Sequence, residues 1–431
     1  MFTAPFGDTS TAVTQVDQRG IDNQHQLLSA PEACALLGVK AQTLYAYVSR
    51  GLVRRVVRRG AGARAYVRDD VERLTARHKA RSGHGPVAAG ALRWGEPVLE
   101  SALTEIGPRG PRYRGFLATA LARQRVGFEA VAELLLTGRA PATPPPPWPK
   151  ALPCGPVARL VPKGAPPLHC LAGVVPALLL RELGRPEPSG AAELDRARAL
   201  IRTLAGALAL GRAGSAGRLE EALRAPSVAS AAAVALGARG QAATEAIDAV
   251  LILSADHELN ASCFTARVAA SAGAGLLHCV SGALQTMTGP LHGASPDRLE
   301  ALLAEAGTAR RIDAVVAARQ RRGEAVIGFG HPLYPGGDPR GAELLALARR
   351  LSSRPRAKAV FTLVRAVERL GGPPPALDVG LVAVTAALGL PPGAAAGLFA
   401  LGRSAGWLAH ALEQRAQGFM LRPRARYVGP P

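Results

Sequence analysis

Three histidines lie in short polar breaks between apolar stretches of the chain. They are His257 in ADHELNAS, His292 in TGPLHGAS and His331 in IGFGHPLY. A neutral imidazole can donate a hydrogen bond to a carbonyl oxygen that gains negative charge during a reaction. Pro290, just before His292, is typical of a helix start, where free backbone N–H groups and the helix dipole favour the neutral ring. The histidines therefore predict a site that stabilises an oxyanion.

One carboxylate and several arginines complete this set. Asp378 in PALDVGLVAV has apolar neighbours on both sides, so desolvation is expected to raise its pKa and its basicity. Arg340 follows a Gly-Gly-Asp-Pro turn, and Arg403 and Arg422 lie in FALGRSAGWL and LRPRARYVG. The planar guanidinium can bind a carboxylate through two hydrogen bonds. Together these residues predict a site that binds a dicarboxylate-like anion and removes a proton from carbon.

The elements that must position these residues are helices. Of the 431 residues, 48% are hydrophobic and only 4% aromatic, and the apolar residues are mostly Ala and Leu, which pack helices closely. Residues 169–421 form helix-length apolar segments separated by Gly and Pro, and we expect an all-α main domain. A short Arg- and Gly-rich loop near 107–115, a helix around FEAVAELLLTG and an irregular Pro-rich stretch over 142–153 precede it.

Residues 27–80 predict a small winged helix-turn-helix. Ser29 is a suitable N-cap, with Pro31 in the first turn and Glu32 completing a capping box, and Gly38 ends this first helix. A second helix follows and ends at Gly51. An alternating apolar and basic stretch then predicts a β-wing that turns at 60–62, with a closing helix from about residue 69.

Basic residues concentrate in this segment, within a chain whose formal net charge is +20. In winged helix-turn-helix proteins of the MerR or excisionase type, which the segment resembles, the second helix enters the major groove and the wing contacts phosphates. The alternative is a helical appendage with a solvated basic face that serves oligomerisation or has lost its role. The candidate DNA-binding residues are Gln42, Thr43, Tyr45, Arg50, Arg54, Arg55, Arg58 and Arg59.

The cysteines, the apolar runs and the remaining histidines bear on other classes of protein and on other candidate residues. The five cysteines form no CxxC pair and no His/Cys cluster at metal-ligand spacing, so we expect neither a disulfide scaffold nor a metal site. We also expect no membrane segment and a cytoplasmic location, with a disordered tail over 1–26 and a linker over 81–95. His278 and His410 lie on helix-like runs and are expected in the core or an interface, and Cys263 and Cys279 are expected to be buried.

The motifs occur in an order and spacing that resemble the citrate synthase family. ADHELNAS, GPLHG, GFGH followed by DPR, GRSAGWLAHALEQ and RPRARYVG carry the resemblance, which covers roughly residues 100–430. The helix-turn-helix resembles an extra domain of some bacterial members. The resemblance implies an all-α enzyme domain over 96–431 with a small subdomain at roughly 295–400 that closes over the large one, and a homodimer.

The resemblance also implies a role for each residue of the set. Asp378 would remove a methyl proton of acetyl-CoA, His292 would hydrogen-bond the thioester oxygen, and His331 would polarise the ketone of oxaloacetate. Ser262 would steady His292, and Arg422 would come from the partner subunit. Oxaloacetate would be held by His257, Arg340, Arg403 and Arg422. Acetyl-CoA would be a substrate, with no permanently bound cofactor.

Some positions depart from the family pattern, and two other functions stay open. Ser254 stands where relatives often have histidine, Pro332 where a basic residue often follows the third histidine, and Val379 where an aromatic residue is common. One alternative is a 2-methylcitrate synthase that uses propionyl-CoA. The other is a DNA-binding regulator that senses oxaloacetate or acyl-CoA with little catalysis.

Overall fold

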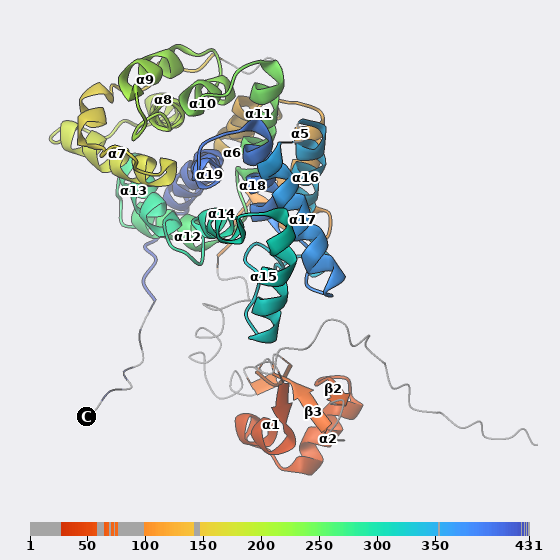
Figure 1. Cartoon of the computed structure of the whole chain (residues 1–431). Coiled ribbons are helices and arrows are strands. Elements are labelled where there is room, and N and C mark those ends of the chain that lie inside the picture. Colours follow the sequence, from red (N-terminus) through yellow and green to blue (C-terminus); the bar gives the residue numbers. More distant parts are fainter. Residues whose placement is uncertain are drawn as a thin grey trace, which may run out of the picture. The chain divides into compact units, whose positions relative to one another are not determined.

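A computed structural model of the chain describes residues 27–57, 64–68, 70–72, 74–75, 99–141, 147–351, 354–423, 425, 427 and 429. The expected tail (1–26) and linker (81–95) lie outside these residues. The chain divides into two compact units, Met1–Glu100 and Ser101–Pro431, which are drawn in Figure 1 and described separately here. Within the described part, no helix is both long enough and apolar enough to cross a membrane.

The described residues of the first unit form two short helices, a three-stranded antiparallel sheet in the order β1-β3-β2, and helical residues at 68, 70–72 and 74–75, where the closing helix is predicted. The Ser29 hydroxyl accepts from the Glu32 amide while the Glu32 carboxylate accepts from the Ser29 amide, so the predicted capping box is confirmed. Gly38 ends the first helix at φ +66°. The elements are β1 (Leu27–Ser29), α1 (Ala30–Leu37), α2 (Ala41–Ser49), β2 (Arg55–Val57) and β3 (Arg64–Val67).

The second unit begins with a small antiparallel sheet rather than the loop expected near 107–115. Its strands are β4 (Thr104–Gly107), β5 (Gly110–Tyr113) and β6 (Phe116–Leu117) in the order β4-β5-β6. The sequence prediction was wrong here because the strands are only two to four residues long and the central one, Gly-Pro-Arg-Tyr, has no apolar alternation. The Tyr113 side chain is fully buried, and its hydroxyl donates to the Ile252 carbonyl at the end of α11 (Gln241–Ser254).

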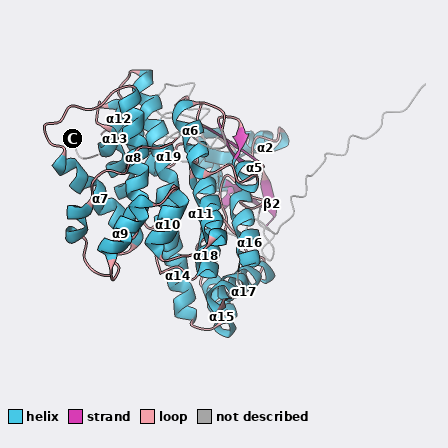
Figure 2. Ribbon diagram, turned by 90° about the horizontal axis from the view of Figure 1, so that it is seen from above, coloured by secondary structure: helices cyan, strands magenta, loops and turns pink. Residues whose placement is uncertain are grey.

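Helices make up the rest of this unit, so the all-α prediction is confirmed (Figure 2). Before α11 the elements are α5 (Ala118–Arg123), α6 (Phe128–Thr137), the 3-10 helix η1 (Gly155–Leu160), α7 (Pro167–Arg181), α8 (Ala191–Ala207), α9 (Ser215–Arg224) and α10 (Val228–Leu236). After α11 they are α12 (Ala261–Ser271), α13 (Leu276–Met287), α14 (Ser295–Ala306), α15 (Ala309–Arg321), α16 (Pro339–Leu351), α17 (Pro355–Arg369), α18 (Leu377–Leu388) and α19 (Ala394–Gln417).

Helix α19 runs through the core and packs against α6, α7, α11, α12 and α13. Gly402 and Gly406 let the end of α11 approach it closely. A Cβ at Gly402 would lie 2.7 Å from the Leu251 carbonyl oxygen, and one at Gly406 would lie 2.3 Å from Asp256 Oδ1. The Gly406 amide donates to the Ala255 carbonyl oxygen. These two glycines therefore fix the chain that leads from α11 to His257 against the central helix.

A second close approach joins α16 and α18, the helices that begin near Arg340 and Asp378. A Cβ at Gly341 would lie 2.5 Å from the Ala376 carbonyl oxygen, and one at Gly380 would lie 2.7 Å from Leu344 Cβ. Because both helix starts lack side chains at the contact, their first turns lie side by side. The arginine and the carboxylate are thereby brought to the same end of the helix pair.

Candidate active site

The three histidines come from three separate chain breaks that meet at one place. His257 follows α11, His292 lies in the turns between α13 and α14, and His331 lies in the loop before α16. Backbone hydrogen bonds from Ala376 to Gly328 and from Gly330 to Pro374 tie the His331 loop to the chain before α18. That these three breaks form one catalytic site stays a prediction.

His257 and His331 form a ring cluster with Tyr334. The two histidine ring centroids are 5.4 Å apart at an interplanar angle of 89°, and the Tyr334 ring lies 5.2 Å from His331. The Tyr334 hydroxyl is 2.9 Å from His257 Nε2. A cavity of about 670 Å³ adjoins this cluster and is lined by Tyr334 and Glu258, with residues 104–108 across from them. Tyr334 is a site residue that the sequence reasoning missed.

Both histidines of the cluster are neutral at physiological pH. Burial and the nearby guanidinium of Arg340 lower the pKa of His257 far below its usual value, and the same two causes lower the pKa of His331. The Leu333 amide donates to His331 Nδ1, which places the proton of the neutral His331 ring on Nε2. The Nε2–H group of His331 is therefore a hydrogen-bond donor.

Arg340 and Arg403 supply two buried positive charges. Arg340 is 2% exposed and makes a bidentate pair with Asp338, at 3.0 Å through Nε and 2.7 Å through Nη2. Its Nη1 is buried and has no hydrogen-bond partner among the described residues. Arg403 is 1% exposed, and its Nε donates to the Ser254 carbonyl oxygen over 2.8 Å. An orphaned guanidinium N–H is a ready donor for an anionic ligand.

His292 is held by a hydroxyl whose hydrogen bonds define the histidine tautomer. The Ser262 hydroxyl donates to Asn260 Oδ1 over 2.7 Å and accepts from Trp407 Nε1 over 3.0 Å. Its third contact is with His292 Nε2 at 2.8 Å. A hydroxyl has one proton, so His292 Nε2 must carry the proton in this contact. Burial and, to a lesser extent, Arg403 lower the pKa of His292 to about 4, and the ring is neutral.

Asp378 lies in the first turn of α18, beside the turn that carries His292. Its Oδ2 accepts from the hydroxyl of Ser295, three residues after His292, over 3.2 Å. Burial raises its pKa to about 6, against the opposing effects of the Ser295 hydrogen bond and Arg340. The raised basicity expected from its apolar flanks is present. A carboxylate with this pKa is ionised at neutral pH and still basic enough to accept a proton.

One residue of the predicted set is not brought into the site of a single chain. Arg422 is exposed in the segment after α19, where the neighbouring Leu421 amide donates to the Ser271 hydroxyl at the end of α12. Ser262 lies where expected, against His292. Cys263 and Cys279 are buried as expected, His410 is fully buried, and His278 is exposed in the single chain.

In the first unit, the DNA-binding candidates differ in how exposed their side chains are and in whether they pair with other residues of the domain. Gln42, Tyr45 and Arg50 are exposed on or after α2, with Tyr45 at 44%, and Thr43 is half-buried. Arg55 is exposed on β2. Arg54 is held within the domain, since its Nε and Nη2 both donate to the Asp70 carboxylate. Arg58 and Arg59 lie outside the described residues.

Two family models match the chain. Residues 91–424 match the citrate synthase C-terminal domain, and residues 28–85 match the MerR helix-turn-helix family of regulatory proteins. In its fold the chain resembles the citrate synthase of the archaeon Thermoplasma acidophilum, which was solved in a ternary complex with carboxymethyl coenzyme A and oxaloacetate. The TM-score is 0.69 at 23% identity over 78% of this chain and 94% of that one.

Several curated proteins match part of the chain. A Mycobacterium tuberculosis protein provisionally named as a second citrate synthase is 41% identical over 192 residues, covering 43% of this chain and 52% of that protein. Citrate synthase 2 of Bacillus subtilis is 35% identical over 190 residues, and the 2-methylcitrate synthase of Shewanella oneidensis 33% over 190 residues; each match covers 43% of this chain and 51% of the relative. The chain spans about half the length of the curated relatives it matches.

Proposed function

The chain belongs to the citrate synthase family, and from that premise we propose that it condenses acetyl-CoA with oxaloacetate and water to give citrate and CoA. One observation carries the proposal. Asp378, with a pKa of about 6, is hydrogen-bonded to Ser295, which begins α14 directly after the turn that carries the neutral His292. A base and a neutral donor close to each other are what proton abstraction next to a thioester carbonyl requires.

In the first step the Asp378 carboxylate takes a methyl proton from acetyl-CoA, and the C–H electron pair forms the enolate. His292 donates a hydrogen bond to the thioester oxygen as charge develops there. Because His292 Nε2 faces Ser262, this donor is Nδ1–H, so the Ser262 hydroxyl must turn from Asn260 toward His292 Nε2. Asn260 Oδ1 keeps its hydrogen bond from the Cys263 amide during this change.

In the second step the enolate carbon attacks the ketone carbon of oxaloacetate. His331 polarises the ketone through Nε2–H, while His257 and Arg403 hold the oxaloacetate oxygens. The orphaned Nη1 of Arg340 is an available donor for a substrate carboxylate. The π electron pair of the ketone passes to its oxygen, which takes the Nε2 proton of His331 to give citryl-CoA. Hydrolysis of its thioester by water releases citrate and CoA and drives the reaction forward. Closure of the small subdomain, roughly 295–400, would keep water from the enolate.

The test is release of free thiol from acetyl-CoA in the presence of oxaloacetate. Wild type is compared with Asp378→Ala and His292→Ala, and the exposed His278→Ala is the matched control. We expect turnover in wild type and in the control, and loss of most of it in the two site variants. Parallel assays with propionyl-CoA decide whether the chain is instead a 2-methylcitrate synthase. If the folded wild-type protein releases no thiol from acetyl-CoA or propionyl-CoA, the proposed catalytic function is refuted.

We further propose that the enzyme is a homodimer in which Arg422 completes the site of the partner subunit. Its exposure in the single chain is compatible with that role. Asp378→Ala and Arg422→Ala chains are inactive by themselves in this scheme. When the two chains are mixed and pair at random, half of the dimers are hybrids, and each hybrid has one of its two sites intact. The mixture should therefore recover about a quarter of wild-type activity. No recovery in confirmed hybrids would contradict the shared site.

For the first unit we propose DNA binding through α2, which exposes Gln42 and Tyr45 with Arg50 at its end. Affinity for duplex DNA should fall steeply with salt, since phosphate contacts release counterions. The chain lacking residues 1–85 should keep its turnover and lose DNA binding. Salt-dependent DNA binding together with negligible turnover of the whole chain would favour the regulator over the enzyme.

A further inference from the structure

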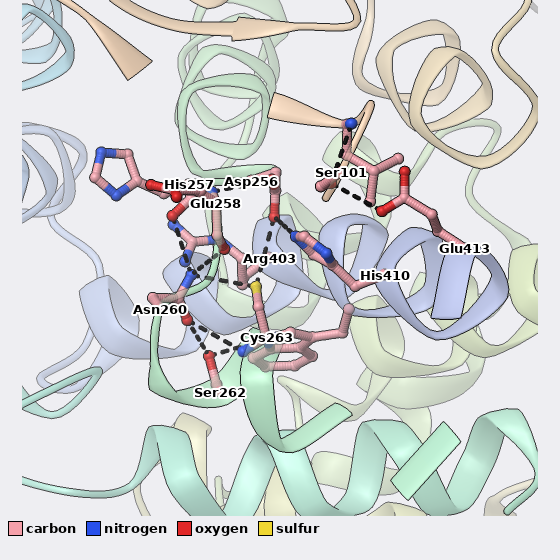
Figure 3. Close-up of polar contacts among 12 residues, drawn as sticks. Ser101, Asp256, His257, Glu258, Asn260, Ser262, Cys263, Arg403, His410 and Glu413 are labelled. Atoms are coloured by element: carbon pink, nitrogen blue, oxygen red, sulfur yellow. Dashed lines mark hydrogen bonds and ion pairs between the residues drawn. The ribbon is translucent and has the colours of Figure 1, made fainter. Parts of the chain in front are cut away.

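A line of buried polar side chains lies behind the oxaloacetate-binding residues proposed above. It runs from Asp256 through His410 and Arg267 to Glu413. Figure 3 shows Asp256 beside His410, and Glu413 further along the same helix. The side chains of Asp256, His410 and Arg267 are all fully buried. None of the three has a part in the reaction steps. Charged groups at this depth are costly unless each has a partner, so their arrangement calls for a reason.

The tautomer of His410 follows from its neighbour. Arg267 Nε donates to His410 Nδ1 over 2.9 Å. A guanidinium nitrogen has only protons to offer, so Nδ1 must accept, and the proton of the neutral ring is on Nε2. His410 Nε2 lies 3.3 Å from Asp256 Oδ1. Arg267 therefore leaves His410 with its Nε2–H group next to the Asp256 carboxylate, at an ion-pair distance and with no closer hydrogen-bond partner among the described residues.

Arg267 is itself held by the last turns of α19. Its Nη1 donates to Gln414 Oε1 over 3.0 Å, and its Nη2 pairs with Glu413. The Glu413 carboxylate also accepts from the Ser101 hydroxyl and the Ala102 amide, each over 2.8 Å. The positive charge of Arg267 is thus balanced by Glu413, and the orientation of its Nε toward His410 is fixed from the other side.

The opposite end of the line reaches two residues of the proposed site. Asp256 Oδ2 accepts from the Glu258 amide over 3.2 Å, which fixes the backbone on both sides of His257. Burial would raise the pKa of Asp256, but the His410 ring and the Arg403 guanidinium outweigh it and hold that pKa well below its usual range. The carboxylate is therefore ionised and is a counter-charge for Arg403.

We infer that Asp256, oriented by His410 and Arg267, is a positioning residue for the oxaloacetate pocket. It fixes the backbone that carries His257 and the guanidinium of Arg403, and it contacts no substrate itself. The inference rests on the proposed function, since it assigns these two side chains to oxaloacetate.

Asp256 and His410, together with Cys263, are also side chains of types that bind metal ions. Asp256, Cys263 and His410 each offer a ligand atom, and these atoms lie within 4.8 Å of one another. The hydrogen bonds favour the positioning role instead. His410 Nε2 carries a proton, and the Cys263 thiol, whose pKa burial raises far above its usual value, donates to Asp256 Oδ1 over 3.5 Å. A metal ion would need both groups deprotonated beside the positive charge of Arg403.

The first experiment is calorimetric binding of oxaloacetate to the full chain, with wild type beside Asp256→Asn. The asparagine keeps the shape but must turn its NH2 group toward either His410 Nε2–H or the Glu258 amide, so one contact is lost in each orientation. We expect oxaloacetate affinity to fall about tenfold or more, a loss of about 1.4 kcal/mol. The KM for acetyl-CoA should change less than twofold, because the Asp378 side of the site is untouched.

Two further variants separate positioning from a general effect on folding. Glutamine in His410→Gln can donate to Asp256 and accept from Arg267, so this variant should bind oxaloacetate like wild type, whereas His410→Leu should bind as weakly as Asp256→Asn. Asp248→Asn is the matched control, because Asp248 is a half-buried carboxylate that accepts from the Phe128 amide and lies outside the site. It should leave oxaloacetate affinity unchanged.

The possible results distinguish a failure of the positioning role from a failure of the proposed condensation. Removing a negative charge beside Arg403 would by itself strengthen binding of a dianion, so unchanged or tighter binding in a folded Asp256→Asn protein overturns the inference. One transition-metal ion per chain, lost in Cys263→Ala, would also overturn it. Wild type that binds oxaloacetate without turnover refutes the proposed condensation alone, because affinities still test the positioning role. Wild type that binds no oxaloacetate refutes both.

Discussion

Two aspartates in the same domain, the half-buried Asp378 and the fully buried Asp256, have pKa values shifted in opposite directions. Asp378, at the start of α18, has a pKa raised to about 6, and its one hydrogen bond shown here comes from a hydroxyl. Asp256, after α11, has a pKa held well below its usual range by His410 and Arg403. The comparison shows that burial makes a carboxylate basic only where no strong donor or counter-charge accompanies it. The first environment suits a base and the second suits a fixed support.

The largest expected effect is on the catalytic rate, because only Asp378 of the two aspartates takes part in the proposed reaction. Asp378→Asn removes the base, and kcat for thiol release should fall by about 10³–10⁴-fold, the upper part of the range for general base catalysis. Oxaloacetate affinity, measured by calorimetry, should stay close to wild type. A variant that keeps more than a tenth of the wild-type kcat would remove Asp378 from the role of base.

The next effect concerns stability and should have the opposite sign in the two regions. The low folded-state pKa of Asp256 contributes stability that is present above its unfolded pKa and lost as the pH falls through the folded value. Asp256→Asn also leaves His410 Nε2–H and Arg403 with weaker partners. We expect the free energy of unfolding at pH 7 to drop by about 3 kcal/mol. Chemical denaturation measures this, and no loss would mean that the carboxylate is not ionised.

For Asp378 the same linkage predicts a gain. Its folded-state pKa of about 6 exceeds the unfolded value, so its contribution is fully present below the unfolded pKa and is lost as the pH rises through about 6. An asparagine needs no deprotonation, and Asp378→Asn should stabilise the protein by on the order of 1–2 kcal/mol at pH 8. The gain should vanish at pH 4. Equal stability of the variant and wild type at both pH values would contradict the raised pKa.

The smallest expected effect tests how the hydrogen bond from the Ser295 hydroxyl changes the pKa of Asp378. The rate at limiting acetyl-CoA should rise with pH and level off above about 6, as the Asp378 carboxylate ionises. The Ser295 hydroxyl stabilises the ionised form, so Ser295→Ala should move the midpoint to higher pH. Ser215→Ala, at the start of the distant helix α9, should leave the midpoint in place. A downward shift in Ser295→Ala would show that the hydroxyl acts differently.

The sequence was informative where a residue's neighbours in the chain define its environment. The apolar flanks of Asp378 were enough to expect a basic carboxylate, and Ser29 and Glu32 were enough to place the first helix. The breaks around His257, His292 and His331 identified the candidate site because polar rings between apolar helices are conspicuous. The small sheet over 104–117 was missed because its strands are two to four residues long and the central one, Gly-Pro-Arg-Tyr, has no apolar alternation.

The role of Asp256 could not be read in the same way. Nothing in LSADHE distinguishes it from a solvated acid, because His410, Arg267 and Arg403 come from other helices. Tyr334 was missed for the same reason, since its contact with His257 joins two loops far apart in the chain. The proton positions on His410 and His292 in this structure also depend on other residues: on Arg267 for His410, and on Ser262 with its partner Asn260 for His292.

The sequence by itself determined the helical class, the order of the motifs and the residue types of the candidate site. These follow from periodicity, helix-capping residues and the flanks of single residues, all of which are local. Only the tertiary structure decided which buried charges are paired and which proton each histidine carries. The pKa of a buried group depends on charges and donors within a few ångströms in space, and close packing of α19 against α11 through Gly402 and Gly406 sets those distances.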